Sequence, residues 1–362
     1  MASIYIHIPF CKHICSYCDF AKIYYDTSFV NKYLDALKKE IDKYYRGEEV
    51  NTIYIGGGTP SLLKIDELNK LFSIIKVFKL NNPEFTFECN IEDINDELLS
   101  ILKNNGVNRL SIGIESTNDE ILKFLNRPYN KDDIDRGIRL AKKYFDNISV
   151  DLMYAIPGET IKDLESDIDS ILKYDVPHIS TYSLIIEPHT KIYNDGIKNI
   201  DEELDRQMYD LICNKLSSYN HYEVSNFGRN GYESKHNLVY WNNKKYYGFG
   251  LGAGGYIDNN RYLNTRNIND YIKGNYRLEE NILSINEVIE NEFILGLRKL
   301  KGINKLEFKN KYNIDINSID IVSKLINENK LIDDGEYIKI KEDLIYVSNS
   351  ILVSFIGVDY NG

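Results

Sequence analysis

Three cysteines fall within eight residues near the N-terminus, at Cys11, Cys15 and Cys18. Thiolates at this close spacing are typical ligands of an iron–sulfur cluster, in which each thiolate binds a different iron. The other two cysteines, Cys89 and Cys213, are isolated, so we expect them to be inert buried thiols. Three protein ligands on a four-iron cluster leave one iron open, and open positions are where metal sites do chemistry. The spacing therefore predicts a 4Fe–4S cluster with an open iron, and a zinc site is the alternative.

Glycines and acidic residues recur where the predicted strands end. The second strand runs into Gly56-Gly57-Gly58-Thr59-Pro60, where the glycines let the backbone approach a ligand and Thr59 adds a hydroxyl. Acidic residues lie within or just after the next three strands, at Glu88, Glu115 and Asp151. Because the carboxyl ends of barrel strands meet at one face, these carboxylates would converge on one ligand. They suit a cationic amine and ribose hydroxyls, both of which are strong donors.

A regular alternation of strand and helix over the first 220 residues must position these groups. Strands are predicted at residues 3–8, 51–55, 84–89, 108–114, 148–154 and 178–186, and helices at 29–45, 66–78, 96–104, 131–144, 161–173 and 202–218. Six such units predict parallel strands joined by right-handed crossovers. The fold class is therefore α/β. One strand and one helix per unit, with the cysteines directly after the first strand, favour a partial (β/α)6 barrel over a doubly wound sheet.

Beyond residue 220 the alternation ends. Residues 221–284 are rich in Gly, Asn and Tyr and are predicted to form an irregular connecting region, with a weak strand near 221–225. Residues 285–362 are expected to form a small winged-helix-like α+β domain. Its helices are predicted at 286–299, 305–311 and 319–328, followed by a hairpin of 337–341 and 344–347. Winged domains often bind DNA, but the acidic balance of this chain favours a structural or docking role.

Composition narrows the classes of protein further. A net charge of −11 and a pI near 5.2 argue against nucleic acid as a partner. No apolar run approaches the ~20 residues of a transmembrane helix, and the N-terminus carries no signal peptide. Five cysteines, three of them clustered, do not fit a disulfide framework. We therefore expect a cytoplasmic protein.

Taken together, these motifs resemble the radical S-adenosylmethionine superfamily, in its coproporphyrinogen-dehydrogenase-like branch. The likeness rests on the run YIHIPFC at 5–11, the CxxxCxxC and GGGTP motifs, and the run DLMYAIPGET at 151–160. It covers nearly the whole chain, with further matches at 180–187 and 248–253. It implies a radical SAM barrel with a 4Fe–4S cluster on the three cysteines, S-adenosylmethionine on the free iron, and an electron donor for the cluster.

The resemblance also implies contacts to S-adenosylmethionine. The positions that match the family's contacts are Tyr5, Tyr17, Gly57, Gly58, Thr59, Glu88, Arg127 and Asp151. Glu115 departs from the branch, which usually has Gln there, so an acceptor remains but a neutral donor is lost. Ala155 replaces the usual Gly, a change that we expect to matter little.

Within the branch, the chain is most similar to the HemW-type haem chaperones. Oxygen-independent coproporphyrinogen oxidases carry a further cysteine two residues after the third, where this chain has Phe20, and an N-terminal extension ahead of the cluster. The run His236-Asn-Leu-Val-Tyr240-Trp241 matches the HNxxYW motif associated with haem handling in that group. Histidine is a good axial iron ligand, and a Tyr–Trp pair offers flat apolar area for a porphyrin. A lone histidine near a tryptophan is also often a hydrogen-bonded core residue.

The resemblance thus implies a chaperone that binds haem, with His236 as candidate ligand, and delivers it to an acceptor protein. The first alternative is an enzyme, an oxygen-independent coproporphyrinogen III oxidase that decarboxylates a propionate by radical chemistry. The second is a radical enzyme acting on RNA. The acidic chain and the lack of a basic, aromatic-lined groove count against that reading.

Overall fold

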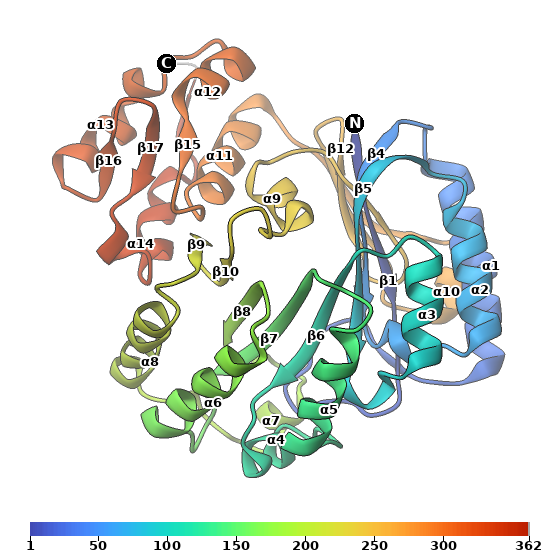
Figure 1. Ribbon diagram of the computed structural model, residues 1–362. Coiled ribbons are helices and arrows are strands. Elements are labelled where there is room, and N and C mark those ends of the chain that lie inside the picture. The colour runs from blue at the N-terminus through green and yellow to red at the C-terminus, as the bar shows by residue number, and fades with distance from the viewer. Residues whose placement is uncertain (361–362) are drawn as a thin grey trace.

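The computed structural model of the chain describes residues 1–360 and is built around one curved sheet (Figure 1). The sheet has nine strands in the order β11-β1-β4-β5-β6-β7-β8-β10-β9. Six neighbouring strands pair in parallel: β1 (Ala2–Ile8), β4 (Glu49–Gly57), β5 (Lys79–Asn90), β6 (Arg109–Glu115), β7 (Ile148–Tyr154) and β8 (His178–Ser183). This confirms the predicted α/β class with a partial (β/α)6 barrel.

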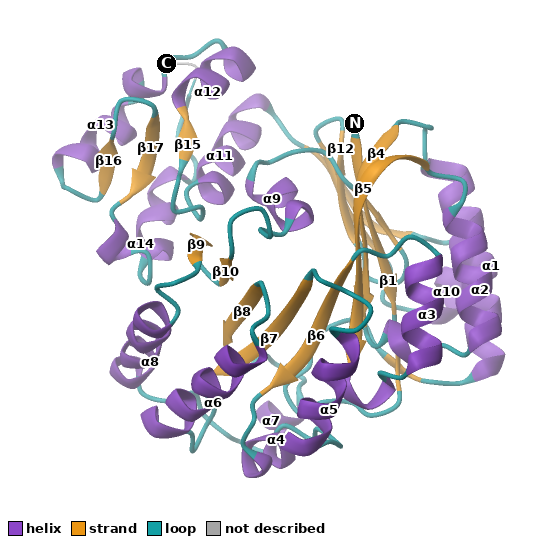
Figure 2. Cartoon of the chain, in the orientation of Figure 1, coloured by secondary structure: helices purple, strands orange, loops and turns teal. Residues whose placement is uncertain are grey.

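Helices cover the outer face of this sheet (Figure 2). They are α1 (Thr27–Tyr44), α2 (Ile65–Ile75), α3 (Asp96–Asn104), α5 (Lys131–Ala141), α6 (Ile161–Tyr174) and α8 (Glu202–Lys215). Their starts are fixed locally: in α6, for example, the hydroxyl of Thr160 accepts a hydrogen bond from the backbone N–H of Asp163, which satisfies an otherwise free donor. Two short helices, α4 (Asp119–Phe124) and α7 (Lys191–Asn194), follow the carboxyl ends of β6 and β8.

Side chains alternate along each strand, and this alternation separates core from site. In β1, Ile4, Ile6 and Ile8 are fully buried in the hydrophobic core, which also contains the apolar residues of α1. Tyr5 and His7 point to the opposite face, where the Tyr5 hydroxyl lies 2.9 Å from Nδ1 of His7. The polar residues of the barrel strands therefore share its interior.

The segment from residue 221 to 284, expected to be irregular, is largely regular. β9 (Asn220–Glu223) and β10 (Asn226–Gly228) extend the sheet at β8, and β11 (Tyr247–Phe249) pairs with β1 at the other edge. Helices α9 (Lys235–Trp241) and α10 (Ile268–Ile272) accompany a separate sheet of β12 (Gly254–Ile257), β13 (Asn260–Asn264) and β14 (Arg277–Ile282). Glycine is needed here because the strands pack closely, not because the chain forms a loop. A Cβ at Gly248 would lie 1.8 Å from the carbonyl oxygen of Gly254.

The C-terminal part has the predicted α+β character but a different hairpin. Helices α11 (Ile285–Gly296), α12 (Lys305–Tyr312) and α13 (Asp320–Asn327) accompany a sheet of β15 (Ile303–Asn304), β17 (Tyr337–Ile340) and β16 (Leu331–Asp333). The hairpin consists of β16 and β17. The predicted strand at 344–347 is wrong, because a 3-10 turn at Glu342–Leu344 stands where that strand would begin. The turn at Asp334-Gly335 explains the pairing. Asp334 accepts from the backbone of Glu336 and Tyr337, and Gly335 has a φ of +96°.

The domain boundaries predicted at residues 220 and 284 stay a prediction. The barrel sheet takes β11 from the connecting region, and one hydrophobic core continues into the C-terminal helices. No helix within residues 1–360 is long and apolar enough to cross a membrane.

Candidate functional site

The three clustered cysteines lie directly beyond the carboxyl end of β1. Cys11 ends the short strand β2 (Phe10–Cys11), which pairs with β3 (Ile23–Tyr24), so the loop between them is tied at both ends. Cys11 is buried, and Cys15 and Cys18 are half-buried. Their thiols line one cavity of about 390 Å³. Burial raises the pKa of Cys11 to about 11, so a metal must displace a proton to bind there.

The arrangement of these thiols fits an iron–sulfur cluster. Within residues 1–360, no three His, Cys, Asp or Glu side chains converge closely enough to hold one metal ion. Three thiols that face the same cavity without converging suit a cubane, in which each takes a different iron. The wall opposite is glycine by necessity, because a Cβ at Gly58 would lie 2.9 Å from Cys11 Sγ. The residues present thus fit the predicted 4Fe–4S cluster.

Glu88, near the end of β5, is held by the neighbouring strand β4. One carboxylate oxygen accepts a hydrogen bond from the Tyr54 hydroxyl at 2.7 Å, and the other accepts from the backbone N–H of Gly57 at 2.9 Å. A Cβ at Gly56 would lie 2.6 Å from this carboxyl group, so only glycine fits beside it. Burial raises the pKa of Glu88, although both hydrogen bonds oppose the rise. The site thus presents one fixed acceptor, suited to an amine.

Glu115 and Arg127 form a buried ion pair on the next wall of the cavity. Arg127 also donates to the Tyr17 hydroxyl at 2.8 Å and to Asn90 Oδ1 at 3.4 Å. Glu115 stands where the branch usually has Gln, and the guanidinium of Arg127 balances its negative charge. The ion pair also links β6 to the cysteine loop, through Tyr17. Glu115 itself has a φ of +56°, in the left-handed region, where β6 ends.

Asp151 is the fourth residue of β7 and lines the same cavity. The Ser111 hydroxyl donates to it at 3.2 Å. Burial, and then the negative charge of Glu115, raises the pKa of Asp151 to about 7. This carboxyl group therefore changes its charge near neutral pH.

The structure brings together most of the predicted contact residues. Those that line the cavity are Tyr17, Gly57, Gly58, Thr59, Glu88, Glu115, Arg127 and Asp151. Tyr5 lies beneath it, packed 6.1 Å from Tyr54 between ring centroids. His236 does not line this cavity: it is the second residue of helix α9 and lies against the amino-terminal half of β4.

Sequence reasoning missed several residues of the same cavity, including Tyr54, Asn90, Ser111 and Tyr182. Tyr54 stands two positions before Gly56, so the two-residue period of a strand could have placed it on the inner face. Cys89, expected to be isolated, lines the cavity wall, although it is packed into the core.

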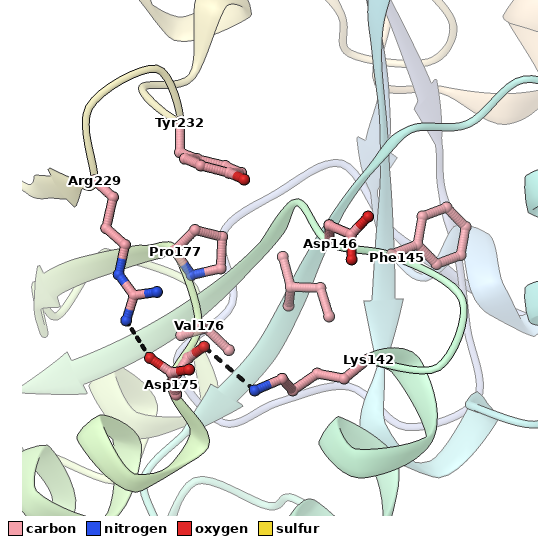
Figure 3. A pocket seen from close by; sticks show the side chains of 9 residues that line it. Lys142, Phe145, Asp146, Asp175, Val176, Pro177, Arg229 and Tyr232 are labelled. Atoms are coloured by element: carbon pink, nitrogen blue, oxygen red, sulfur yellow. Dashed lines mark hydrogen bonds and ion pairs between the residues drawn. The ribbon is translucent and has the colours of Figure 1, made fainter.

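A second pocket, of about 200 Å³, lies at the amino ends of β7 and β8 (Figure 3). Its two cations already have partners. Arg229 forms an ion pair with Asp175, and Lys142 donates to the backbone oxygens of Tyr174 and Asp175. With both cations paired within the protein, this pocket offers no reactive group comparable with the cysteine cavity.

Ala155 follows β7 with a φ of +60°, a conformation in which a Cβ is strained. The substitution that we expected to matter little therefore carries a conformational cost. We predict that Ala155→Gly stabilises the protein by about 1 kcal/mol, measured as the free energy of unfolding in denaturant. Ala36→Gly, within helix α1, is the control and should destabilise it by a similar amount. Equal losses in both variants would contradict the strain at Ala155.

Comparison with known proteins agrees with this geometry. The Radical SAM superfamily is matched over residues 5–171. A protein from Lactococcus lactis named heme chaperone HemW is 38% identical over 99% of this chain and 98% of its own. The protein of the same name from Bacillus subtilis is 39% identical over 99% of this chain and 100% of its own.

Among solved structures, coproporphyrinogen III oxidase (HemN) from Escherichia coli, a radical SAM enzyme, has a TM-score of 0.86 at 20% sequence identity. The match covers 98% of this chain and 90% of that one, and at this identity it shows the fold alone. Fold and site together define a protein of the radical SAM class. Within that class, the chain belongs to the HemW family.

Proposed function

We propose that this chain is a haem chaperone that carries a 4Fe–4S cluster on Cys11, Cys15 and Cys18, binds S-adenosylmethionine beside it, and delivers haem to an acceptor protein. The observation that carries the proposal is the full-length similarity to proteins named heme chaperone HemW. When bound, the cluster would supply an electron from a donor protein and an open iron for the ligand's amino and carboxylate groups. The role of this chain's own residues is to hold both groups in one cavity.

Phe20 supports the chaperone over the decarboxylase. It stands where the oxidases of the branch carry a further cysteine, and it lines the cavity with 67% of its surface exposed. Ile185, 65% exposed, lines the same cavity. The thiol of an oxidase is thus replaced by apolar surface at the cavity mouth.

The haem ligand remains a proposal, and His236 is its candidate. In this structure His236 is 1% exposed, Nδ1 lies 2.8 Å from the Thr52 hydroxyl, and Nε2 lies 2.7 Å from the Tyr240 hydroxyl. Burial lowers its pKa to about 3, which keeps the ring neutral, as an iron ligand must be. Binding to iron therefore requires helix α9 to move and one ring nitrogen to give up its partner.

Haem titration of the anaerobically reconstituted protein tests the function. We expect about one haem per chain, and a weaker complex with an altered Soret band in His236→Ala. We also expect no decarboxylation of coproporphyrinogen by the reduced protein with S-adenosylmethionine. Steady formation of the vinyl product would show that the protein is an oxidase and would contradict the chaperone function. Unchanged haem binding in His236→Ala would remove this residue from the haem site.

A further inference from the structure

Helix α9 closes the amino-terminal side of the barrel and is fastened there by its first two residues. The backbone N–H groups of Lys235 and His236 donate to the two oxygens of Glu84, at 3.1 and 3.0 Å. The His236 ring is held by Thr52 of β4. Glu84 belongs to β5, so His236 connects to both strands that carry the glycine run and Glu88. The helix is therefore anchored to the two strands whose carboxyl ends form the candidate ligand site.

The His236 ring also packs directly against Tyr54. Their ring centroids are 5.3 Å apart, and the planes are tilted by 34°. Tyr54 in turn donates its hydroxyl to Glu88, and the hydrogen bond of 2.7 Å leaves little freedom for either group. Tyr240 lies at the other ring nitrogen of His236 and packs edge-on against the His236 ring, with 5.1 Å between the ring centroids. One side of Tyr54 is thus set by a histidine whose own position is fixed on both ring nitrogens.

We propose that His236 and Tyr54 are positioning residues for S-adenosylmethionine: His236 fixes the Tyr54 ring, and the Tyr54 hydroxyl orients the Glu88 carboxylate toward the ligand's amino group. The inference rests on the proposed function only in taking S-adenosylmethionine as the ligand of this cavity. It gives the HNxxYW histidine a role at the cluster site that does not depend on haem. A neutral ring acts here by packing, since it adds no charge to the site.

Binding of S-adenosylmethionine to the haem-free, anaerobically reconstituted protein tests the proposal. Tyr54→Phe keeps the ring and removes the hydroxyl, and we expect an affinity about tenfold lower, because a hydrogen bond to a buried carboxylate is lost. His236→Ala removes the support of the ring, and we expect a loss of about threefold to tenfold. Iron content should match the parent protein in both variants, since neither residue touches a cysteine.

A double-mutant cycle separates positioning from general damage. If His236 acts through the Tyr54 hydroxyl, His236→Ala in the Tyr54→Phe background should cost no further affinity. His221→Ala is the matched control: this half-buried histidine stacks on Phe227 at 4.2 Å, outside the cavity, and its replacement should leave the affinity unchanged. Should His236→Ala fail to fold, Thr52→Val removes the Nδ1 partner alone, and it should weaken binding less than Tyr54→Phe.

Three results would overturn the inference: parental affinity in Tyr54→Phe, parental affinity in both His236→Ala and Thr52→Val, or effects of Tyr54→Phe and His236→Ala that simply multiply. These results differ from a failure of the proposed function. In that case the parent protein itself would bind no S-adenosylmethionine, whatever stands at positions 54 and 236.

Discussion

Cys11→Ser, Cys15→Ser and Cys18→Ser should each abolish the brown chromophore of the anaerobically reconstituted protein. Every one of the three thiols lines the same cavity, and a cluster with three protein ligands has no spare ligand to lose. A serine hydroxyl is a poor substitute, because soft iron–sulfur clusters prefer thiolates. The measurement is the visible absorption spectrum together with iron and sulfide per chain.

The matched controls are the two remaining cysteines. Cys213→Ser lies on α8, away from the cysteine cavity, and should leave the cluster intact. Cys89→Ser is the sharper control because Cys89 lines the cavity. Burial raises the pKa of the Cys89 thiol far above its usual value, so it resists forming the thiolate that iron needs. Loss of the cluster in Cys89→Ser would make it a fourth ligand and close the open iron.

The barrel could be predicted from sequence because its elements depend on local patterns. The sequence predicts strand β7 and helix α3 to the residue, at Ile148–Tyr154 and Asp96–Asn104. In both, the apolar period matches the element, and Asn95 gives α3 a side-chain cap at Leu98. The convergence of Glu88, Glu115 and Asp151 followed as well, because parallel strands end at one face.

The elements that sequence reasoning missed depend on distant partners. β11 is three residues long and takes its place in the sheet from β1, more than 230 residues earlier in the chain. No sequence pattern in such a short segment, with a glycine at its centre, predicts a strand. The hairpin error is different, since Asp334-Gly335 was a readable turn signal that favoured pairing β16 with β17.

His236 illustrates the limit of a motif. The HNxxYW pattern specifies residue types that suit a porphyrin, but exposure depends on what the fold packs against them. Here Thr52 and Tyr240 occupy both ring nitrogens, and Glu84 caps the helix that carries the ring. Those partners lie on strands β4 and β5 and in the next turn of α9, so only the three-dimensional structure reveals them.

Replacing either inner carboxylate should weaken S-adenosylmethionine binding while leaving iron content unchanged. In Glu88→Ala the acceptor held by Tyr54 and Gly57 is gone, and we expect an affinity about 100-fold lower, as befits the loss of a charged hydrogen bond in a buried site. Asp151→Ala should also lose affinity, because Asp151 lines the same cavity. Equilibrium binding with parallel iron analysis measures both effects, and normal affinity in both variants would show that these carboxylates do not contact the ligand.

Asp151 should also give the binding a pH dependence of predictable sign. Its pKa is raised to about 7, so at lower pH the group is protonated and neutral. The sulfonium of the ligand is positive, and it binds the ionised carboxylate better; by linkage, affinity rises as the pH increases through about 7. Asp151→Asn keeps the shape of the side chain and removes the titration, so its affinity should be low and flat over the same range. A pH dependence that persists in Asp151→Asn would assign the titration to another group, with Glu88 the first to examine because burial raises its pKa as well.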